Sequence, residues 1–240
     1  MILTNRLFKR QAPSKTARSL YIFCEGLDRE YKYFNYFREK DSRINVEVHR
    51  LSHTDDNSPL GLFEIAKAHI LLSEDNPNPK FKFQKNDEVW IVLDTDPDRD
   101  GSREDQINSV KNECSKLNNW FVSESNPCFE VWLYYHFNTE VPILENDEVC
   151  KSWKTFVNDI VSGGFDSRKH PIFIEEAKNN SKSIYSEDNN RPLKSSTQVY
   201  NLAESILEIM IDKIRKVKKS VEGYESITGD LYTRRTNRFN

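Results

Sequence analysis

Four aspartates follow one apolar run at every second position. The stretch EVWIVLDTDPDRDG spans residues 88–101, and its acids are Asp94, Asp96, Asp98 and Asp100. Residues two apart along an extended segment point the same way, so Asp94 and Asp96 can hold one cation together. Carboxylate oxygens are ligands that Mg²⁺ and Mn²⁺ prefer. For Asp98 and Asp100 a solvated turn is the alternative, because Asp-Pro-Asp and Asp-Gly are ordinary turn formers.

A further acid, Glu25, ends a second apolar run, SLYIFC at residues 19–24. In an open parallel sheet, ligands bind beyond the carboxyl ends of the strands. If the strands before Glu25 and Asp94 are neighbours, their carboxylates meet at one edge. Like charges at that spacing raise one another's pKa unless a cation holds them ionised. The pattern therefore predicts a Mg²⁺ or Mn²⁺ site, and its expected ligands are Glu25, Asp94, Asp96 and Asp98.

Alternating strands and helices must position these acids. Apolar runs and period-two alternation predict the strands, and apolar residues three and four apart predict the helices. The order of elements is β-α-β-α-β-α-β-α, which predicts an α/β fold with a mostly parallel central sheet and helices on both faces. The expected strands span 19–24, 43–51, 88–94 and 119–125, and the expected helices span 28–40, 58–74, 102–117 and 126–137.

The chain divides into three predicted segments: a basic lead-in at 1–17, an α/β catalytic core at 18–137 and a C-terminal extension at 138–240. Residues 138–196 show no clear pattern. Residues 195–220 are typical of a long amphipathic helix packed on the core. Its apolar stripe is Val199, Leu202, Ile206, Met210, Ile214 and Val217.

Composition restricts the class of protein. The net charge is −3, from 35 Lys and Arg against 38 Asp and Glu, so whole-chain charge does not indicate a nucleic-acid binder. The 4 cysteines include no C-x-x-C pair, which favours reduced thiols over a disulfide framework or a zinc site. No stretch approaches the roughly 20 apolar residues of a membrane span, and the basic start lacks the apolar core of a signal peptide. We expect a cytoplasmic protein with no membrane partner.

Four stretches together resemble a known family. They are YIFCEGLDREYKYF, EVWIVLDTDPD, SNPCFEVWLYYHF and the later SSTQVYNLAESIL. The Glu-Gly after a first strand, a second Glu opening the next helix and a later Asp-x-Asp look like a Toprim catalytic domain. The full set is similar to the RloB family, over roughly 18–137 and more loosely over 195–210. SNPCFEVWL is the most specific stretch, because Toprim proteins at large do not share it. One departure is Asp28-Arg29, where the family commonly has Lys-Thr.

The resemblance implies a Toprim-like α/β domain that hydrolyses phosphodiester bonds with Mg²⁺ or Mn²⁺ in antiphage defence. It implies catalytic roles for Glu25, Glu30, Asp94, Asp96 and Glu130. Asp94 and Asp96 would hold the metal, and Glu25 would complete its shell or act as general acid or base. A second ion would use Glu30 or Glu130.

The resemblance implies two partners, a DNA or RNA substrate and a separate partner ATPase. The residues themselves do not indicate the ATPase, and this sequence contains no G-x-x-x-x-G-K-[ST] motif. A homo-oligomer is compatible with the sequence. No residue indicates which nucleic acid is bound or which side chains bind it. Hydrolysis is favoured over topoisomerisation because no tyrosine stands out as a nucleophile.

Several alternatives stay open. DPDRDG matches the start of a calcium loop, but its twelfth position is Ile107 and not the required Glu. A strand followed by Asp-x-Asp also opens haloacid-dehalogenase-type phosphatases, in which Glu25 would have no required role. A third alternative is a non-catalytic or partner-dependent subunit of a defence complex.

Single residues near the site also have structural readings. Glu130 lies in an apolar stretch and is either a site residue or the partner of a nearby Lys or Arg. Asn126 and Pro127 are expected to start a helix as its N-cap and first-turn residue, with Asn126 facing the site as the alternative. We expect His136 to be structural and not catalytic.

Overall fold

The computed structural model describes residues 8–96, 102–143, 149–161 and 163–236, without the side chains of Ser102 and 221–236. The four strands of its central sheet are all parallel and lie in the order β2-β1-β3-β4. They are β1 (Arg18–Cys24), β2 (Ile44–His49), β3 (Glu88–Asp94) and β4 (Trp120–Ser125). The expected α/β fold with a parallel sheet is confirmed, and the layout is consistent with a Toprim-like domain.

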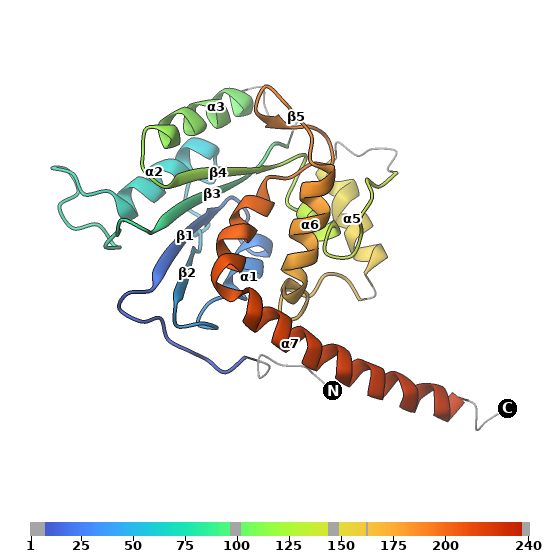
Figure 1. The fold of residues 1–240 in the computed structure, drawn as a ribbon. Helices are drawn as coiled ribbons and strands as arrows, with labels where there is room; N and C mark the ends of the chain where they lie inside the picture. The colour runs from blue at the N-terminus through green and yellow to red at the C-terminus, as the bar shows by residue number, and fades with distance from the viewer. Residues whose placement is uncertain (1–7, 97–101, 144–148, 162, 237–240) are drawn as a thin grey trace.

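Helices cover both faces of this sheet, as the sequence predicts (Figure 1). One face is covered by α2 (Pro59–Ile70) and α3 (Ser102–Ser115). The other is covered by α1 (Arg29–Asn35), α4 (Glu130–Tyr134), α5 (Cys150–Ile160), α6 (Ile174–Ile184) and α7 (Val199–Thr236). Each layer has its own apolar core, because successive strand residues face opposite sides of the sheet. Leu20 and Ile22 of β1 enter one core, while Tyr21 and Phe23 enter the other.

The carboxyl ends of β1 and β3 lie side by side. Cys24, the last residue of β1, pairs with Val92 of β3, and the sheet ends two residues later at Asp94. Six of the seven β3 residues are buried, which explains why its sequence is a continuous apolar run and not an alternating one. β2 lies at one edge and alternates buried with half-buried residues.

The segment that showed no clear pattern contains α5, α6, a 3₁₀ turn at His170–Phe173 and a short hairpin of β5 (Glu187–Asp188) and β6 (Arg191–Pro192). α5 and α6 bury Trp153, Val157 and Ala177 in the same core as α1 and α4. The apolar stripe of α7 packs into this core, as predicted. Its members Val199, Leu202, Ile206, Met210 and Ile214 are buried, and Val217 is half-buried.

The expected helix at 126–137 is wrong in its extent. The helix spans Glu130–Tyr134, and its N-cap position is Phe129. The Asn126–Pro127 peptide bond is cis and precedes the helix, so these residues are neither its N-cap nor its first turn. The Asn126 side chain instead donates a hydrogen bond to the Pro192 carbonyl at 2.8 Å.

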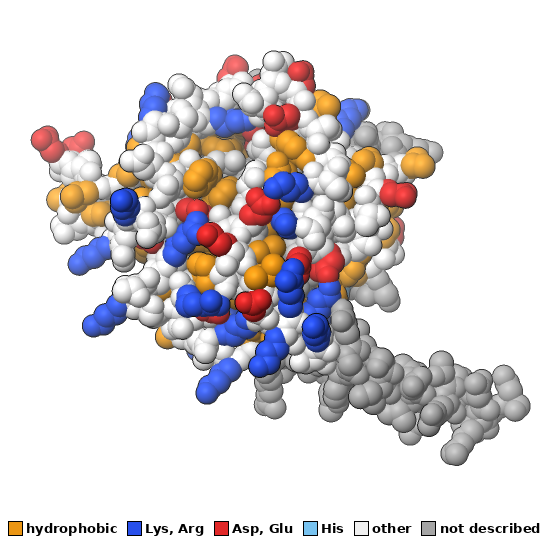
Figure 2. All heavy atoms as spheres, viewed as in Figure 1, with side chains coloured by type: hydrophobic (Ala, Val, Ile, Leu, Met, Phe, Trp, Pro, Cys, Tyr) orange, Lys and Arg blue, Asp and Glu red, His pale blue; other side chains and the backbone are white. Residues whose placement is uncertain are grey.

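The surface is strongly polar. Figure 2 shows Lys and Arg side chains interleaved with Asp and Glu over the visible face, with apolar side chains scattered among them. Among the described residues, no helix combines the length and apolar character needed to cross a membrane. Cys24, Cys114, Cys128 and Cys150 are all free thiols.

Candidate active site

Glu25 and Asp94 meet at the carboxyl edge of the sheet. Glu25 directly follows β1, and its carboxylate accepts a hydrogen bond from the Asp94 backbone N–H at 3.3 Å. The Asp94 carboxylate accepts one from the backbone N–H of Phe129 at 2.9 Å, just before α4. The structure therefore brings together the two acids that the sequence placed after neighbouring strands.

Glu30 reaches the same edge from the first turn of α1. Its side chain is buried, and its carboxylate lies against the backbone of Gly26. A Cβ at position 26 would collide with all three atoms of the Glu30 carboxylate group. A side chain at position 26 would therefore force the Glu30 carboxylate away from its present place, so Gly26 leaves room for this placement of Glu30.

Glu130 completes the acid cluster, which we define as Glu25, Glu30, Asp94 and Glu130. Glu130 is 3% exposed and accepts a hydrogen bond from Arg29 Nη1 at 2.9 Å. Its charge also helps to raise the pKa of both Glu30 and Asp94. The expected pairing of Glu130 with an arginine is confirmed, and its role as a site residue stays a prediction.

Burial and mutual repulsion oppose ionisation of the cluster. The pKa of Glu30 is raised to about 7, first by burial and then by the charges of Glu130 and Glu25, against a backbone hydrogen bond that lowers it. The pKa of Asp94 is raised well above its usual range, first by burial and then by Glu30, Glu25 and Glu130. A cation bound among these groups would favour their ionised forms.

Arg103, which sequence reasoning missed, packs against the cluster from the first turn of α3. Its guanidinium is buried, forms an ion pair with Glu25 and donates from Nε to the Asp94 carbonyl at 3.0 Å. The feature of the sequence that could have indicated Arg103 is its position. It lies in the first turn of the helix that follows the acidic stretch after β3, which places it near the edge where β3 ends. Arg29 was likewise noted only as a departure from the family pattern.

Asp96 has contacts of its own. Its φ is 36°, so the extended backbone of β3 does not continue through Asp96. Its backbone N–H donates to the Pro127 carbonyl at 2.9 Å, and its carboxylate accepts a hydrogen bond from the Cys150 thiol at 3.4 Å. Asp98, also an expected ligand, lies outside the described residues.

The chemistry of the cluster fits a divalent cation, although its present pairing is with arginines. Across the described ranges, no group of three or more His, Cys, Asp or Glu side chains is arranged to hold a metal ion. The cluster nevertheless supplies hard oxygen donors whose ionisation a cation would favour. The hydroxyl of Thr95, beside Asp94, is buried and has no hydrogen-bond partner among the described residues. Mg²⁺ or Mn²⁺ would take over the charge compensation that Arg103 provides to Glu25.

His136 is structural in its contacts. It is buried, with Nε2 at 3.0 Å from the Tyr33 hydroxyl and Nδ1 at 3.1 Å from the Trp132 carbonyl. Burial lowers its pKa to about 3, so the ring is neutral at physiological pH. Both ring nitrogens are therefore already used inside the core.

Comparison with known proteins gives one match. The family model described as RloB-like protein matches residues 20–206, which include β2, β3, β4, most of β1 and every member of the acid cluster. Neither the curated proteins nor the solved structures include one that matches this chain. Since the matched region covers most of the 240 residues, the chain belongs to the RloB-like family.

Proposed function

We propose that this chain is a Mg²⁺- or Mn²⁺-dependent nuclease that hydrolyses phosphodiester bonds in DNA or RNA. The observation that carries the proposal is the convergence of buried acids from β1, α1, β3 and α4 at the carboxyl edge of the sheet. A stable core has no need of repelling buried carboxylates, and strongly perturbed acids in such a position are typical of catalytic sites. Hydrolysis of a phosphodiester needs both charge compensation and proton transfer, and these acids can serve both.

Glu25, Asp94 and Glu130 are the residues we assign to the metal, with Asp96 and Asp98 as further candidates. When bound, the metal supplies charge neutralisation at the phosphate and lowers the pKa of a water ligand. Arg103 and Arg29 orient the carboxylates of Glu25 and Glu130 by their ion pairs. The Phe129 N–H fixes one oxygen of Asp94.

Glu30 is the residue we assign to proton transfer. A general acid or base works best when its pKa lies near the working pH, and the pKa of Glu30 is raised to about 7. Gly26 lets the carboxylate lie close to the loop after β1, where Glu25 sits. Glu30 would take a proton from the attacking water and return one to the leaving oxygen.

A role in antiphage defence together with a separate ATPase is proposed on the family resemblance alone. The phosphatase alternative uses Asp94 but gives Glu25 no required role. The partner-dependent alternative keeps the same site but predicts no turnover by this chain alone. One set of assays separates all three readings.

The test is cleavage of labelled single- and double-stranded DNA and RNA by the intact chain, with Mg²⁺, Mn²⁺ or EDTA. We expect Glu30→Gln and Asp94→Asn each to lower the rate by about 100-fold or more, a typical loss for a proton-transfer or metal-binding group. Glu25→Gln should do the same in a nuclease, whereas a phosphatase would release phosphate from p-nitrophenyl phosphate, a substrate assayed in parallel, with or without this substitution. Matched controls are Glu64→Gln on α2 and Glu113→Gln on α3, which remove exposed acids from the opposite face.

Circular dichroism must show that every variant is folded. Cleavage that survives Glu30→Gln and Asp94→Asn would contradict the site. An intact, folded chain that cleaves none of the substrates with either metal would contradict an autonomous nuclease and favour the partner-dependent subunit.

A further inference from the structure

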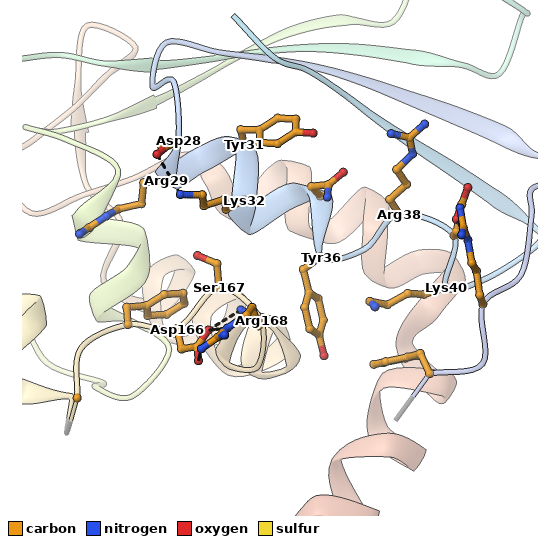
Figure 3. Close-up of a pocket in the computed structure, with 16 residues that line it drawn as sticks. Asp28, Arg29, Tyr31, Lys32, Tyr36, Arg38, Lys40, Asp166, Ser167 and Arg168 are labelled. Atoms are coloured by element: carbon orange, nitrogen blue, oxygen red, sulfur yellow. Dashed lines mark hydrogen bonds and ion pairs between the residues drawn. The ribbon is translucent and has the colours of Figure 1, made fainter. Parts of the chain in front are cut away.

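A basic pocket of about 1210 Å³ lies beside the acid cluster (Figure 3). α1 and the turns after it form one wall, and the segment 163–168 forms another. Figure 3 shows Tyr36 projecting toward the side on which Arg168 lies, while the Lys32 side chain turns toward Asp28. The charged lining is predominantly positive. Its cations are Arg10, Arg29, Lys32, Arg38, Lys40 and Arg168, and its acids are Asp28, Glu39 and Asp166.

Two of these cations are held by exposed local ion pairs. Lys32 pairs with Asp28 at 2.9 Å, and Arg168 pairs with Asp166 at 2.8 Å. The side chains of Lys32 and Arg168 are 58% and 77% exposed. An exposed Lys–Asp pair contributes little to stability, so Lys32 can turn toward a phosphate group at small cost. Arg168 holds Asp166 through two hydrogen bonds, from Nε at 2.9 Å and from Nη2 at 2.8 Å, and its guanidinium has further N–H groups that can donate to a phosphate.

α1 links the pocket to the acid cluster. Arg29 lines the pocket and donates to Glu130, while the next residue, Glu30, is buried in the cluster. One short helix therefore carries an acid of the cluster on one side and cations of the pocket lining on the other. Arg29 belongs both to the pocket lining and to the ion pairs of the cluster.

Two partly accessible aromatic rings, Tyr31 and Phe165, line the pocket among its cations. Tyr36 and Lys40 also line it but are buried, with the Lys40 ammonium 4.6 Å from the Tyr36 ring centroid. A positive groove with accessible aromatic rings is the pattern by which proteins bind nucleic-acid strands. The volume also exceeds the range of about 300–1,000 Å³ that is usual for a small-molecule site, which favours an extended ligand.

We propose that this pocket binds the sugar-phosphate backbone of the strand to be cut and directs it to the acid cluster. The proposal rests on the proposed nuclease function, because it assigns the substrate groove of that same site. DNA and RNA share the phosphodiester chemistry that the cations recognise, and the experiment distinguishes them.

The test is strand binding in EDTA, where metal-dependent cleavage cannot occur. Fluorescence anisotropy of short labelled single-stranded DNA and RNA is measured over a range of salt concentrations. We expect binding that weakens with salt, and we expect Lys32→Gln and Arg168→Gln each to reduce the slope of log K against log[salt] by about 0.7.

The controls remove equivalent exposed cations from the opposite face of the sheet. Lys67 pairs with Glu64 at 2.9 Å on α2, and Lys116 pairs with Glu113 at 2.6 Å on α3. Lys67→Gln and Lys116→Gln should bind as the intact chain does. Asp94→Asn should also bind the strand although it cannot cleave it.

The outcomes of the binding experiment test the role of the pocket independently of the nuclease assay. Loss of affinity and of salt slope confined to Lys32→Gln and Arg168→Gln supports the pocket, even if the chain needs a partner for cleavage. The same loss in the Lys67 and Lys116 controls, or unchanged binding in both pocket variants, would overturn it and leave the cleavage result intact. An intact chain that binds neither strand would overturn it as well.

Discussion

Glu30 is the residue at which structure and chemistry are most closely joined. The side chain of Glu30 is only 7% exposed and lies among other acids, whereas an apolar residue usually occupies such a buried position in a protein. Here the neighbouring Gly26 lacks a side chain, which leaves Glu30 the space it occupies. In the metal-free protein, ionisation of Glu30 is therefore unfavourable, because the charged carboxylate is buried away from water.

The raised pKa of Glu30 predicts how stability varies with pH. The unfolded chain loses this proton near pH 4.5 and the folded chain near pH 7, so between these values the folded state binds more protons. The contribution of Glu30 to the free energy of unfolding in EDTA should therefore fall by roughly 1–3 kcal/mol as pH rises from about 4.5 to 7. The raised pKa of Asp94 acts in the same direction. His49, His136 and His170, whose pKa values burial lowers, contribute a rise over the same range, so the effect of Glu30 is measured as the difference between the intact chain and a Glu30 variant. Urea titrations across this range measure the effect.

Glu30→Gln is the decisive variant for this pH dependence. It keeps the shape of the side chain and removes the proton equilibrium, so relative to the intact chain the free energy of unfolding of Glu30→Gln should increase as pH rises from about 4.5 to 7. Glu64→Gln on the surface of α2 should keep the pH dependence of the intact chain. If Glu30→Gln instead kept the same pH dependence as the intact chain, the folded pKa of Glu30 would not contribute to it.

At the scale of elements, α3 fixes the edge at which β1 and β3 end. Arg103 is the connecting residue, because it pairs with Glu25 after β1 and donates to the Asp94 carbonyl at the end of β3. Removing one partner of a buried ion pair leaves the other charge uncompensated. We expect Arg103→Met to lower the free energy of unfolding at neutral pH by about 3–5 kcal/mol.

A double-mutant cycle identifies the source of that loss. The double variant Glu25→Gln with Arg103→Met removes both charges. Its loss of free energy of unfolding should therefore be smaller than the sum of the losses in the two single variants. Arg168→Met, which removes an exposed arginine, should leave stability nearly unchanged. Additive effects of Glu25→Gln and Arg103→Met would show that the ion pair does not connect the two strands with α3.

The strands were predictable because the burial of a strand determines the spacing of its apolar residues in the sequence. β1 and β3 are covered on both faces and read as apolar runs, while the edge strand β2 reads as an alternation. The segment at Asn126 was not predictable in this way. Its backbone N–H donates to Ser196, and its side chain donates to Pro192, so contacts about 70 residues away set its conformation.

The residues of the candidate site also divide into those whose positions the local sequence predicts and those whose positions depend on distant contacts. Glu25, Glu30, Asp94 and Glu130 converge because local motifs place each at an end of an element that meets the carboxyl edge. The position of Asp96 depends on a left-handed backbone and on contacts to Pro127 and Cys150, which no local spacing encodes. The arginine partners are also long-range, since 101 residues separate Arg29 from Glu130.

At the scale of the whole molecule, the C-terminal extension shares the core of the sheet. Ile206 and Met210 of α7 lie in the same apolar cluster as Leu20 of β1 and Trp90 of β3. Backbone contacts join them as well, since the Gln198 N–H donates to the Glu124 carbonyl at 2.7 Å. Elements on both sides of residue 138 thus bury one continuous surface, which is the basis for expecting them to unfold together.

We therefore predict one cooperative transition for the described part of the chain. Hydrogen exchange followed by mass spectrometry in increasing urea should give the same midpoint for peptides covering 88–94 and 199–214. Ile206→Ala should lower the free energy of unfolding by about 2–5 kcal/mol and shift both peptides equally, because the cavity opens in the shared core. Lys216→Ala, on the exposed side of α7, should shift neither. A shift confined to 199–214 would show that α7 and the sheet are separate folding units, and the extension would then be a second domain.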